Sequence, residues 1–339
     1  MIVDAIAALV DGESLDRTRS RAVMVEIMGG EATQAQIGGF LVALRAKGET
    51  PEEIAGLAEA MQEHVVPVAP HRTPVVDVVG TGGDGAHTFN ISTAAALVAA
   101  SAGAAVAKHG NRAASSACGA ADVLEALGIA IEQPPERIAQ AIDELGFGFM
   151  FARVHHPAMR HVAGARQELG VRTVFNILGP LANPAGARDG VFGVYAPTLA
   201  RTYADALARL GARHAFVVHG DGGIDELSPT GPNLVLEVVD GSIREWELYP
   251  RSLGIYPADP AALRGGSPTE NAAAIRSVLA GEKGPRRDAV LLNAAGALVA
   301  ASLAADFADG IDIAGAAIDS GHAADRLQQI VEFSNGELG

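Results

Sequence analysis

The chain has 339 residues, of which 49% are hydrophobic and 19% charged, so it can form one large α/β domain or two domains and is too apolar to be disordered. Its formal net charge of −15 opposes the counterion release that drives nucleic-acid binding, and an aromatic content of 4% offers no stacking surface for single strands. These values argue against a nucleic-acid partner. They favour a small ligand held by local amides and a few cations.

The first 70 residues are predicted to form a small domain of helices only. Thr33 and Gln36 match a capping box ahead of an apolar repeat of helical period. Thr50 and Pro51 match the start of the next helix. Two prolines then mark a linker, so we expect this domain to span residues 1–70.

From residue 71 short apolar runs alternate with helical stretches, which is typical of a mostly parallel sheet flanked by helices. The predicted strands are Val75–Val79, Ala104–Lys108, Val191–Tyr195, His214–His219 and Ala289–Leu292. The strand pattern lapses over residues 157–185, so we expect that segment to pack on the helical domain. Residues 71–156 and 186–339 would then form the larger α/β domain.

The uncharged run 289–305 is too short for a membrane span and contains Asn293, so it is predicted to be a buried strand, turn and helix. The N-terminus lacks the basic leader of a signal peptide. The single cysteine, Cys118, excludes an internal disulfide and agrees with a reducing compartment. These features predict a cytoplasmic protein without a membrane association.

The most informative segment runs from Val75 to Thr93, where an apolar strand is followed by a glycine-rich loop and a helix. Glycines allow close approach to a ligand, and the amides at a helix N-terminus attract an anion. Asn90, Ser92 and Thr93 offer side-chain caps or donors at the same point. A second polar run, residues 108–116, follows one helix-length later, so the two runs predict one phosphate site between adjacent strands. Either run alone is also typical of a tight βα turn, and neither matches the P-loop or the dinucleotide fingerprint.

Three further candidates carry charge. Asp225 and Glu226 follow an apolar strand and a glycine turn, which places hard oxygen ligands at a strand end, although such a pair alone is usually a solvated loop. Arg166 could hold a carboxylate or lie on a helix surface. Lys108 could serve an anion site or be a solvated lysine at a strand end. Three histidines between residues 155 and 161 fit no common zinc spacing.

Several ordered motifs resemble those of the anthranilate phosphoribosyltransferase family over nearly the whole chain. They are Gly80–Asp84, Asn90–Thr93, Lys108–Arg112, Arg166–Gly170, Gly179–Pro184 and Asp225–Glu226. The resemblance implies a pentosyl transfer: phosphoribose moves from phosphoribosyl pyrophosphate (PRPP) to the amino group of anthranilate, and pyrophosphate leaves, in tryptophan biosynthesis. It also implies a nucleoside phosphorylase-like fold, Mg²⁺ with two ions accompanying PRPP, a homodimer formed through the helical domain, and an active site between the domains.

The resemblance also implies roles for single residues. The implied PRPP-binding residues are Gly80, Gly83, Asp84, Thr88, Asn90, Ile91, Ser92, Thr93, Lys108, His109, Gly110, Asn111, Arg112, Ala113, Ala114, Ser115, Ser116 and Ala120. The implied anthranilate-binding residues are Gly80, His109, Asn111, His156, Arg166 and Pro180. The implied metal ligands are Ser92, Asp225 and Glu226, and the implied catalytic residues are Asp84, Lys108 and Arg166. Which loop holds which phosphate stays open.

Elementary chemistry agrees with these roles. An ammonium group at Lys108 would offset the charge that grows on the leaving pyrophosphate, and the planar guanidinium of Arg166 can form two parallel hydrogen bonds to a carboxylate. The amine of anthranilate is neutral near pH 7, so no strong base is needed to free its lone pair. Positioning of the acceptor should therefore account for most of its effect on the rate. Three positions depart from the family pattern and bear on affinity: Ala120, where many relatives have a phosphate-binding serine, Cys118 and Met159.

Two other functions compete with this interpretation. A pyrimidine nucleoside phosphorylase would share the architecture and also handle ribose and phosphate, but the motifs at residues 108–112 and 225–226 argue against it. A non-catalytic relative of the fold that binds nucleic acid would need a basic surface, which the net charge of −15 disfavours.

Overall fold

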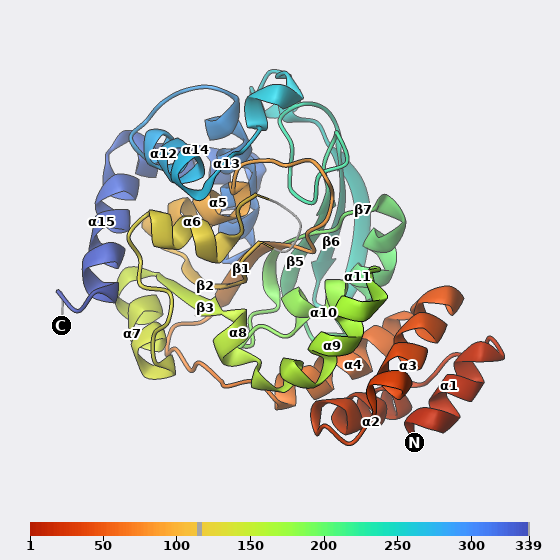
Figure 1. Ribbon diagram of the computed structural model, residues 1–339. Coiled ribbons are helices and arrows are strands. Elements are labelled where there is room, and N and C mark those ends of the chain that lie inside the picture. The colour runs from red at the N-terminus through yellow and green to blue at the C-terminus, as the bar shows by residue number, and fades with distance from the viewer. Residues whose placement is uncertain (114–116, 338–339) are drawn as a thin grey trace.

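The computed structural model describes residues 1–113 and 117–337 and places a helical bundle beside a larger α/β domain (Figure 1). Residues 1–70, all of which are described, form four helices: α1 (Ile2–Val10), α2 (Arg17–Met28), α3 (Gln34–Lys47) and α4 (Pro51–Glu63). Capping boxes at Thr33 and Thr50 begin α3 and α4, as the sequence predicted. The prediction of an N-terminal domain made only of helices is confirmed.

Across the described residues, seven strands form one sheet in the order β3-β2-β1-β4-β5-β6-β7. They are β1 (Val75–Gly80), β2 (Ala105–Gly110), β3 (Phe147–Phe151), β4 (Asp189–Gly193), β5 (His214–His219), β6 (Asn233–Val239) and β7 (Ser242–Leu248). The first five strands are parallel to one another, and β6 and β7 add an antiparallel edge. The mostly parallel sheet is therefore confirmed.

The sheet also indicates where a ligand should bind. The chain order reverses between β1 and β4, which lie side by side and pair up to Gly80 and Gly193. In open α/β sheets the crevice at such a reversal, outside the carboxyl ends of the strands, is the usual ligand site. The glycine-rich loop leaves β1 at this point.

Some predicted elements were wrong or missing. Ala289–Leu292 is not a strand, because it lies within α13 (Pro285–Ala300), and the predicted strand, turn and helix over residues 289–305 is also wrong. Every residue of α13 from Ala289 onward is buried, so this helix has no polar face to reveal its helical period. The strands β3, β6 and β7 were missed. Within residues 1–113 and 117–337, no helix combines the length and hydropathy needed to cross a bilayer.

Helices cover both faces of the sheet (Figure 1). The helices that pack on the sheet are α5 (Ile91–Ser101), α7 (Pro135–Leu145), α11 (Pro197–Leu210) and α13. Four more pack mainly on other helices: α6 (Ala120–Ala126), α12 (Pro268–Leu279), α14 (Phe307–Asp319) and α15 (His322–Ser334). On one face α5 and α13 pack on Val76, Val78 and Val106. On the other face, α11 packs between the sheet and α4, so one hydrophobic core runs from the sheet into the bundle.

The segment between β3 and β4 also contacts the bundle. It contains α8 (Ala152–His155), α9 (Arg160–Leu169) and α10 (Phe175–Leu178). Val162 and Phe175 join the same core as Phe40 of α3. The side chain of Gln34 accepts a hydrogen bond from the backbone of α9 and donates another to it, at 2.8 Å each. These contacts seat α9 on α3 while the ends of the segment enter the sheet domain.

Candidate functional site

The glycine loop, residues 80–85, meets Asp225 at the carboxyl ends of β1 and β4. A Cβ atom on Gly80 would lie 2.2 Å from Asp225 Oδ2, and one on Gly193 would lie 1.5 Å from the Asp225 carbonyl oxygen. Asp225 can occupy this position only because both strands end in glycine. Two motifs more than 140 residues apart in sequence therefore share one place in the fold.

Hydrogen bonds from two sides hold this loop. The backbone N–H of Thr81 donates to Gly193 O at 2.9 Å, and that of Gly82 donates to Asp225 Oδ2 at 2.5 Å. Gly82 and Gly83 have φ values of 72° and 76°, which only glycine adopts readily. The glycines that the sequence indicated are thus required by the geometry of the loop.

Acidic side chains gather beside the N-terminus of α5. Glu226 Oε1 accepts a hydrogen bond from the Ser92 N–H at 2.8 Å, and Glu226 Oε2 accepts one from the Thr88 hydroxyl at 3.4 Å. Asp84 Oδ2 accepts from the Asp225 N–H at 3.4 Å. Burial, and then repulsion from neighbouring carboxylates, raises the pKa of both Asp225 and Glu226.

This donor set fits Mg²⁺, which prefers a few carboxylates completed by phosphate oxygens and water. Buried carboxylates that repel one another are stabilised by a cation between them. Within the described part of the chain, no three His, Cys, Asp or Glu side chains form a metal site unaided. An ion beside Asp225 and Glu226 would thus take further ligands from its substrate.

Lys108 is buried and is not a solvated lysine. Its Nζ donates to Val78 O at 2.7 Å, and both Asp77 and Glu226 lie near enough to stabilise its charge. Burial nevertheless lowers the pKa of Lys108 from its ordinary value. Lys108 therefore places its side-chain nitrogen close to the acidic residues Asp77 and Glu226 from β2.

Asp77 and Asn183 support these strand ends, and the sequence analysis assigned a role to neither, although Asn183 lies within the motif Gly179–Pro184. Asn183 Nδ2 donates to Asp77 Oδ2 at 2.9 Å and to Ala107 O at 2.8 Å, and the His109 N–H donates to Asp77 at 3.3 Å. Burial raises the pKa of Asp77 to about 6, with Lys108 opposing the rise. An aspartate inside the apolar run of β1 was the available signal, since a buried carboxylate needs such partners.

Three further residues predicted for the site, Asn90, Ile91 and Thr93, lie at the start of α5, where mainly their backbone groups are available to a ligand. Ile91 and Thr93 are fully buried in the first turn. Asn90 forms no side-chain cap, so of its two predicted roles, cap or donor, the structure shows the donor. Its amide instead donates to Cys118 O at 3.3 Å and accepts from Asn271 at 2.9 Å, because the loop before α6 lies close to α5.

The second polar run divides between a strand and a loop. Lys108, His109 and Gly110 end β2 rather than beginning a loop. Asn111 is exposed, and the guanidinium of Arg112 bonds to the acids Asp122 and Glu125 of α6. The predicted residues Ala114, Ser115 and Ser116 lie outside the described residues.

Asp122 also organises the backbone around this run. Its Oδ2 accepts from the N–H groups of Ala113 and Gly119, at 2.9 Å each. Ala120 is the first residue of α6, and its methyl group would lie 3.0 Å from a Cβ on Gly110. Ala120 thus faces the end of β2, so a serine there would point at the same strand end.

Two histidines and a proline loop meet on the opposite side of β2. His109 Nε2 lies 3.1 Å from His156 Nε2, and His109 Nδ1 donates to Gly179 O at 3.2 Å, which draws the Pro180 loop against the strand. Burial lowers the pKa of both rings, that of His156 to about 4. Both are therefore neutral near pH 7 and share one hydrogen bond.

Arg166 is half-buried on α9, with its guanidinium 5.4 Å from the centre of the Phe175 ring. Its guanidinium forms no hydrogen bond or ion pair with the residues the structure describes, although the Arg166 carbonyl oxygen accepts from the Gly170 N–H. Burial lowers the pKa of Arg166 from its ordinary value. A half-buried guanidinium without a hydrogen-bonding partner is suited to a carboxylate ligand.

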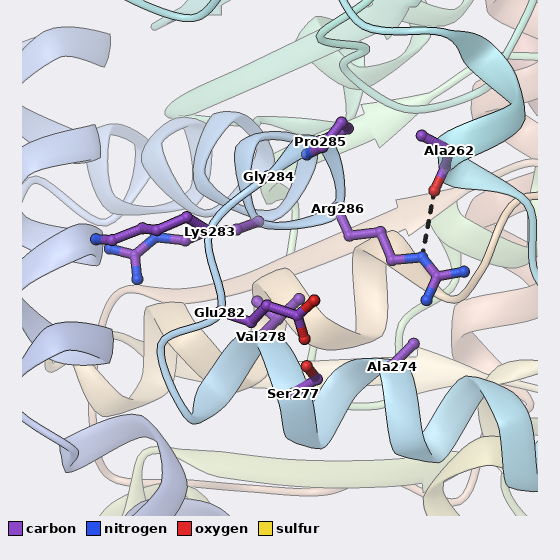
Figure 2. A pocket seen from close by; sticks show the side chains of 10 residues that line it. Ala262, Ala274, Ser277, Val278, Glu282, Lys283, Gly284, Pro285 and Arg286 are labelled. Atoms are coloured by element: carbon purple, nitrogen blue, oxygen red, sulfur yellow. Dashed lines mark hydrogen bonds between the residues drawn. The ribbon is translucent and has the colours of Figure 1, made fainter.

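A separate pocket between α12 and α13 contains none of these residues (Figure 2). Arg286 points at Ala262 there and donates to its carbonyl at 3.2 Å, while Lys283 and Arg287 both bond to Asp319. Because these cations already have partners within the protein, the pocket is not an alternative anion site.

Comparisons with known proteins identify relatives of the whole chain. Residues 3–65 match the helical bundle domain of a glycosyl transferase family, and residues 72–324 match its a/b domain. The anthranilate phosphoribosyltransferase of Chloroflexus aggregans is 55% identical over 99% of both chains. The crystal structure of the Thermus thermophilus enzyme covers 98% of this chain and 99% of its own, with 51% identity and a TM-score of 0.93. The Saccharomyces cerevisiae enzyme in complex with PRPP and Mg covers 99% and 98%, with 29% identity and a TM-score of 0.90.

Proposed function

Because this chain belongs to the anthranilate phosphoribosyltransferase family, we propose that its site transfers the phosphoribosyl group of PRPP to the amino group of anthranilate. The C1–O bond to pyrophosphate breaks, a C1–N bond forms, and the amine loses a proton. The observation that carries the proposal is the position of Asp225 over Gly80 and Gly193, because it joins a phosphate loop to a metal ligand where the strand order reverses.

PRPP would lie between the two polar runs. The amides of the glycine loop and of the first turn of α5 suit its phosphate groups, and residues 108–113 and Ala120 would line the other side. Lys108 would add positive potential where charge grows on the leaving pyrophosphate. Asp84 would contribute to the same site through its contact with Asp225, whose backbone N–H donates to Asp84 Oδ2.

Asp225 and Glu226, with the Ser92 hydroxyl, would hold Mg²⁺, and we propose two ions because PRPP brings more phosphate oxygens than one octahedral ion needs. When bound, Mg²⁺ would neutralise the pyrophosphate. The yeast relative was solved with PRPP and Mg, which supports Mg²⁺ as the ion that accompanies PRPP.

Anthranilate would lie on the α9 side of the site. Arg166 is the proposed clamp for its carboxylate, and Asn111, Pro180 and the neutral pair His109–His156 would line the ring. Neutral histidines suit an amine that is already neutral, since the acceptor needs orientation more than a strong base.

The direct test follows the fluorescence of anthranilate. We expect it to fall only when protein, PRPP and Mg²⁺ are all present, and uridine with inorganic phosphate to give no phosphorolysis. Unchanged fluorescence with a folded, monodisperse sample would refute the proposal, and uridine cleavage would favour the phosphorylase alternative.

We also propose that the bundle forms a homodimer. Val3 and Val10 of α1 are 58% and 71% exposed, and Val42 of α3 is 45% exposed. Ile6 lies between the two valines of α1 and touches α3 where a Cβ on Gly39 would be 3.5 Å away. Exposed apolar side chains on two packed helices suit a self-complementary two-fold interface.

Sedimentation can test this assembly. Val3→Glu combined with Val10→Glu should give a folded monomer. Val239→Glu changes a 40% exposed valine on β6 and should leave the dimer intact. A monomeric wild-type protein at micromolar concentration would contradict the proposed interface.

A further inference from the structure

Arg172 joins the glycine loop to the segment that carries Arg166. It follows the end of α9 by three residues, and its Nη2 donates to Gly83 O. Its guanidinium also lies 4.2 Å from the centre of the Tyr195 ring, just beyond β4. Among the described hydrogen bonds, the bond to Gly83 is the one that reaches the glycine loop from residues 157–185.

The backbone of Arg172 is held as well. Its carbonyl oxygen accepts a hydrogen bond from Arg45 of α3, so the residue is tied to the bundle at one end and to the loop at the other. Tyr195 is itself anchored to the loop, because its N–H donates to Thr81 Oγ1 at 3.1 Å. The guanidinium of Arg172 thus stacks on the Tyr195 ring and hydrogen-bonds to Gly83 at the same time. A planar guanidinium can do both, whereas the ammonium group of a lysine cannot.

The loop is shaped to receive this side chain. Gly83 has a φ of 76°, and a Cβ there would lie 3.2 Å from Arg172 Nη2. Gly82 and Gly85 also have positive φ values, but a Cβ on either would meet nothing within 4 Å. Of these three glycines, Gly83 is therefore the one that needs its lack of a side chain for contact as well as for conformation.

We infer that Arg172 is a positioning residue that clasps the glycine loop to the α9 segment and orders the loop before PRPP binds. The inference rests on the proposed function. A loop ordered in advance loses less conformational freedom on binding, so its amides bind a phosphate more tightly. Because Arg166 lies on the same segment, the clasp also fixes the acceptor side relative to the donor loop.

The test compares Arg172→Ala with Arg160→Ala, which removes an exposed arginine from the same segment. Arg172→Ala should raise the KM for PRPP about tenfold, while kcat changes less. A tenfold change corresponds to the free-energy cost of fixing the backbone of roughly one residue. Arg172→Lys should not restore the KM, because lysine keeps the charge but cannot stack and fork. Tyr195→Leu should give a smaller rise and add little to Arg172→Ala, since both remove one unit.

Hydrogen exchange gives a readout that does not depend on activity. Without substrates, the amides of residues 82–86 should exchange faster in Arg172→Ala than in the wild type and in Arg160→Ala. Unchanged exchange and an unchanged KM would overturn the inference. Full rescue by Arg172→Lys would also overturn it and assign a direct charge contact with the substrate. If Arg172→Ala does not fold, Tyr195→Leu tests the same clasp. If the wild-type protein does not consume anthranilate, the proposed function is refuted, but the hydrogen-exchange comparison still tests the clasp.

Discussion

The substitution Gly80→Ala tests the centre of the site with one methyl group. The added Cβ would lie 2.2 Å from Asp225 Oδ2 and 2.9 Å from the Asp225 carbonyl oxygen. Non-bonded carbon and oxygen atoms need a separation of about 3.3 Å or more, so the carboxylate must move by about 1 Å. It cannot swing freely, because Oδ2 accepts the Gly82 N–H at 2.5 Å and holds the glycine loop.

Two magnitudes follow from this clash. Overpacking of a close-packed site costs about 1–3 kcal/mol of folding free energy. A displacement of about 1 Å in a catalytic group lowers the rate by about 100-fold. Activity should therefore fall much further than stability, since the moved side chain is a proposed metal ligand.

The assay measures kcat/KM for PRPP by anthranilate fluorescence and unfolding by urea titration. Gly315→Ala is a matched control, because a Cβ there meets only Arg287 Nη2 at 3.8 Å within a helix. It should leave activity unchanged and stabilise the protein by about 0.5–1 kcal/mol. If Gly80→Ala keeps kcat/KM within about threefold of the wild type, the placement of Asp225 at the reaction centre is refuted.

Three other substitutions test individual groups. Arg166→Ala should raise the KM for anthranilate by about 10- to 100-fold, the value of a charge-assisted hydrogen-bonded pair, and leave the KM for PRPP nearly unchanged; equal effects on both would contradict the clamp. Lys108→Met should lower kcat by about 100-fold or more, measured at saturating substrates, and a milder loss would remove Lys108 from the charge balance. Asp77→Asn should alter the pH dependence of stability. Burial raises the pKa of Asp77 from 3.8 to about 6, so the folded state binds this proton more tightly than the unfolded chain does. The wild type should therefore lose about 3 kcal/mol as pH rises through that window, and the variant should lack this component in urea unfolding; parallel pH profiles would contradict the assignment.

Local signals in the sequence were sufficient for the helical domain and for the phosphate loops. Thr33 and Thr50 mark helix starts independently of the tertiary structure, because the side chain of an N-cap residue bonds to a backbone amide within three residues. The glycines after β1 announce a sharp turn for the same local reason. The ordered motifs then pointed to the family, which the comparisons confirm.

Other features depend on neighbours that no short window contains. The helix α13 is enclosed on all sides, so no polar face marks its period, and its buried run resembles a strand. The antiparallel strands β6 and β7 are stabilised by pairing with β5 and with each other more than by their own pattern. Partners such as Asn183 for Asp77 become visible only when two strand ends lie side by side.

The site shows the same division between local and long-range information. Residue types and spacing indicated which groups are suited to phosphate, metal and carboxylate, because that chemistry resides in the side chains and in short stretches of backbone. The strand order decided that Asp225 lies over Gly80, that Lys108 is buried opposite Glu226, and that Arg172 reaches the glycine loop. These distances arise from packing between distant segments, so the tertiary structure alone determines them.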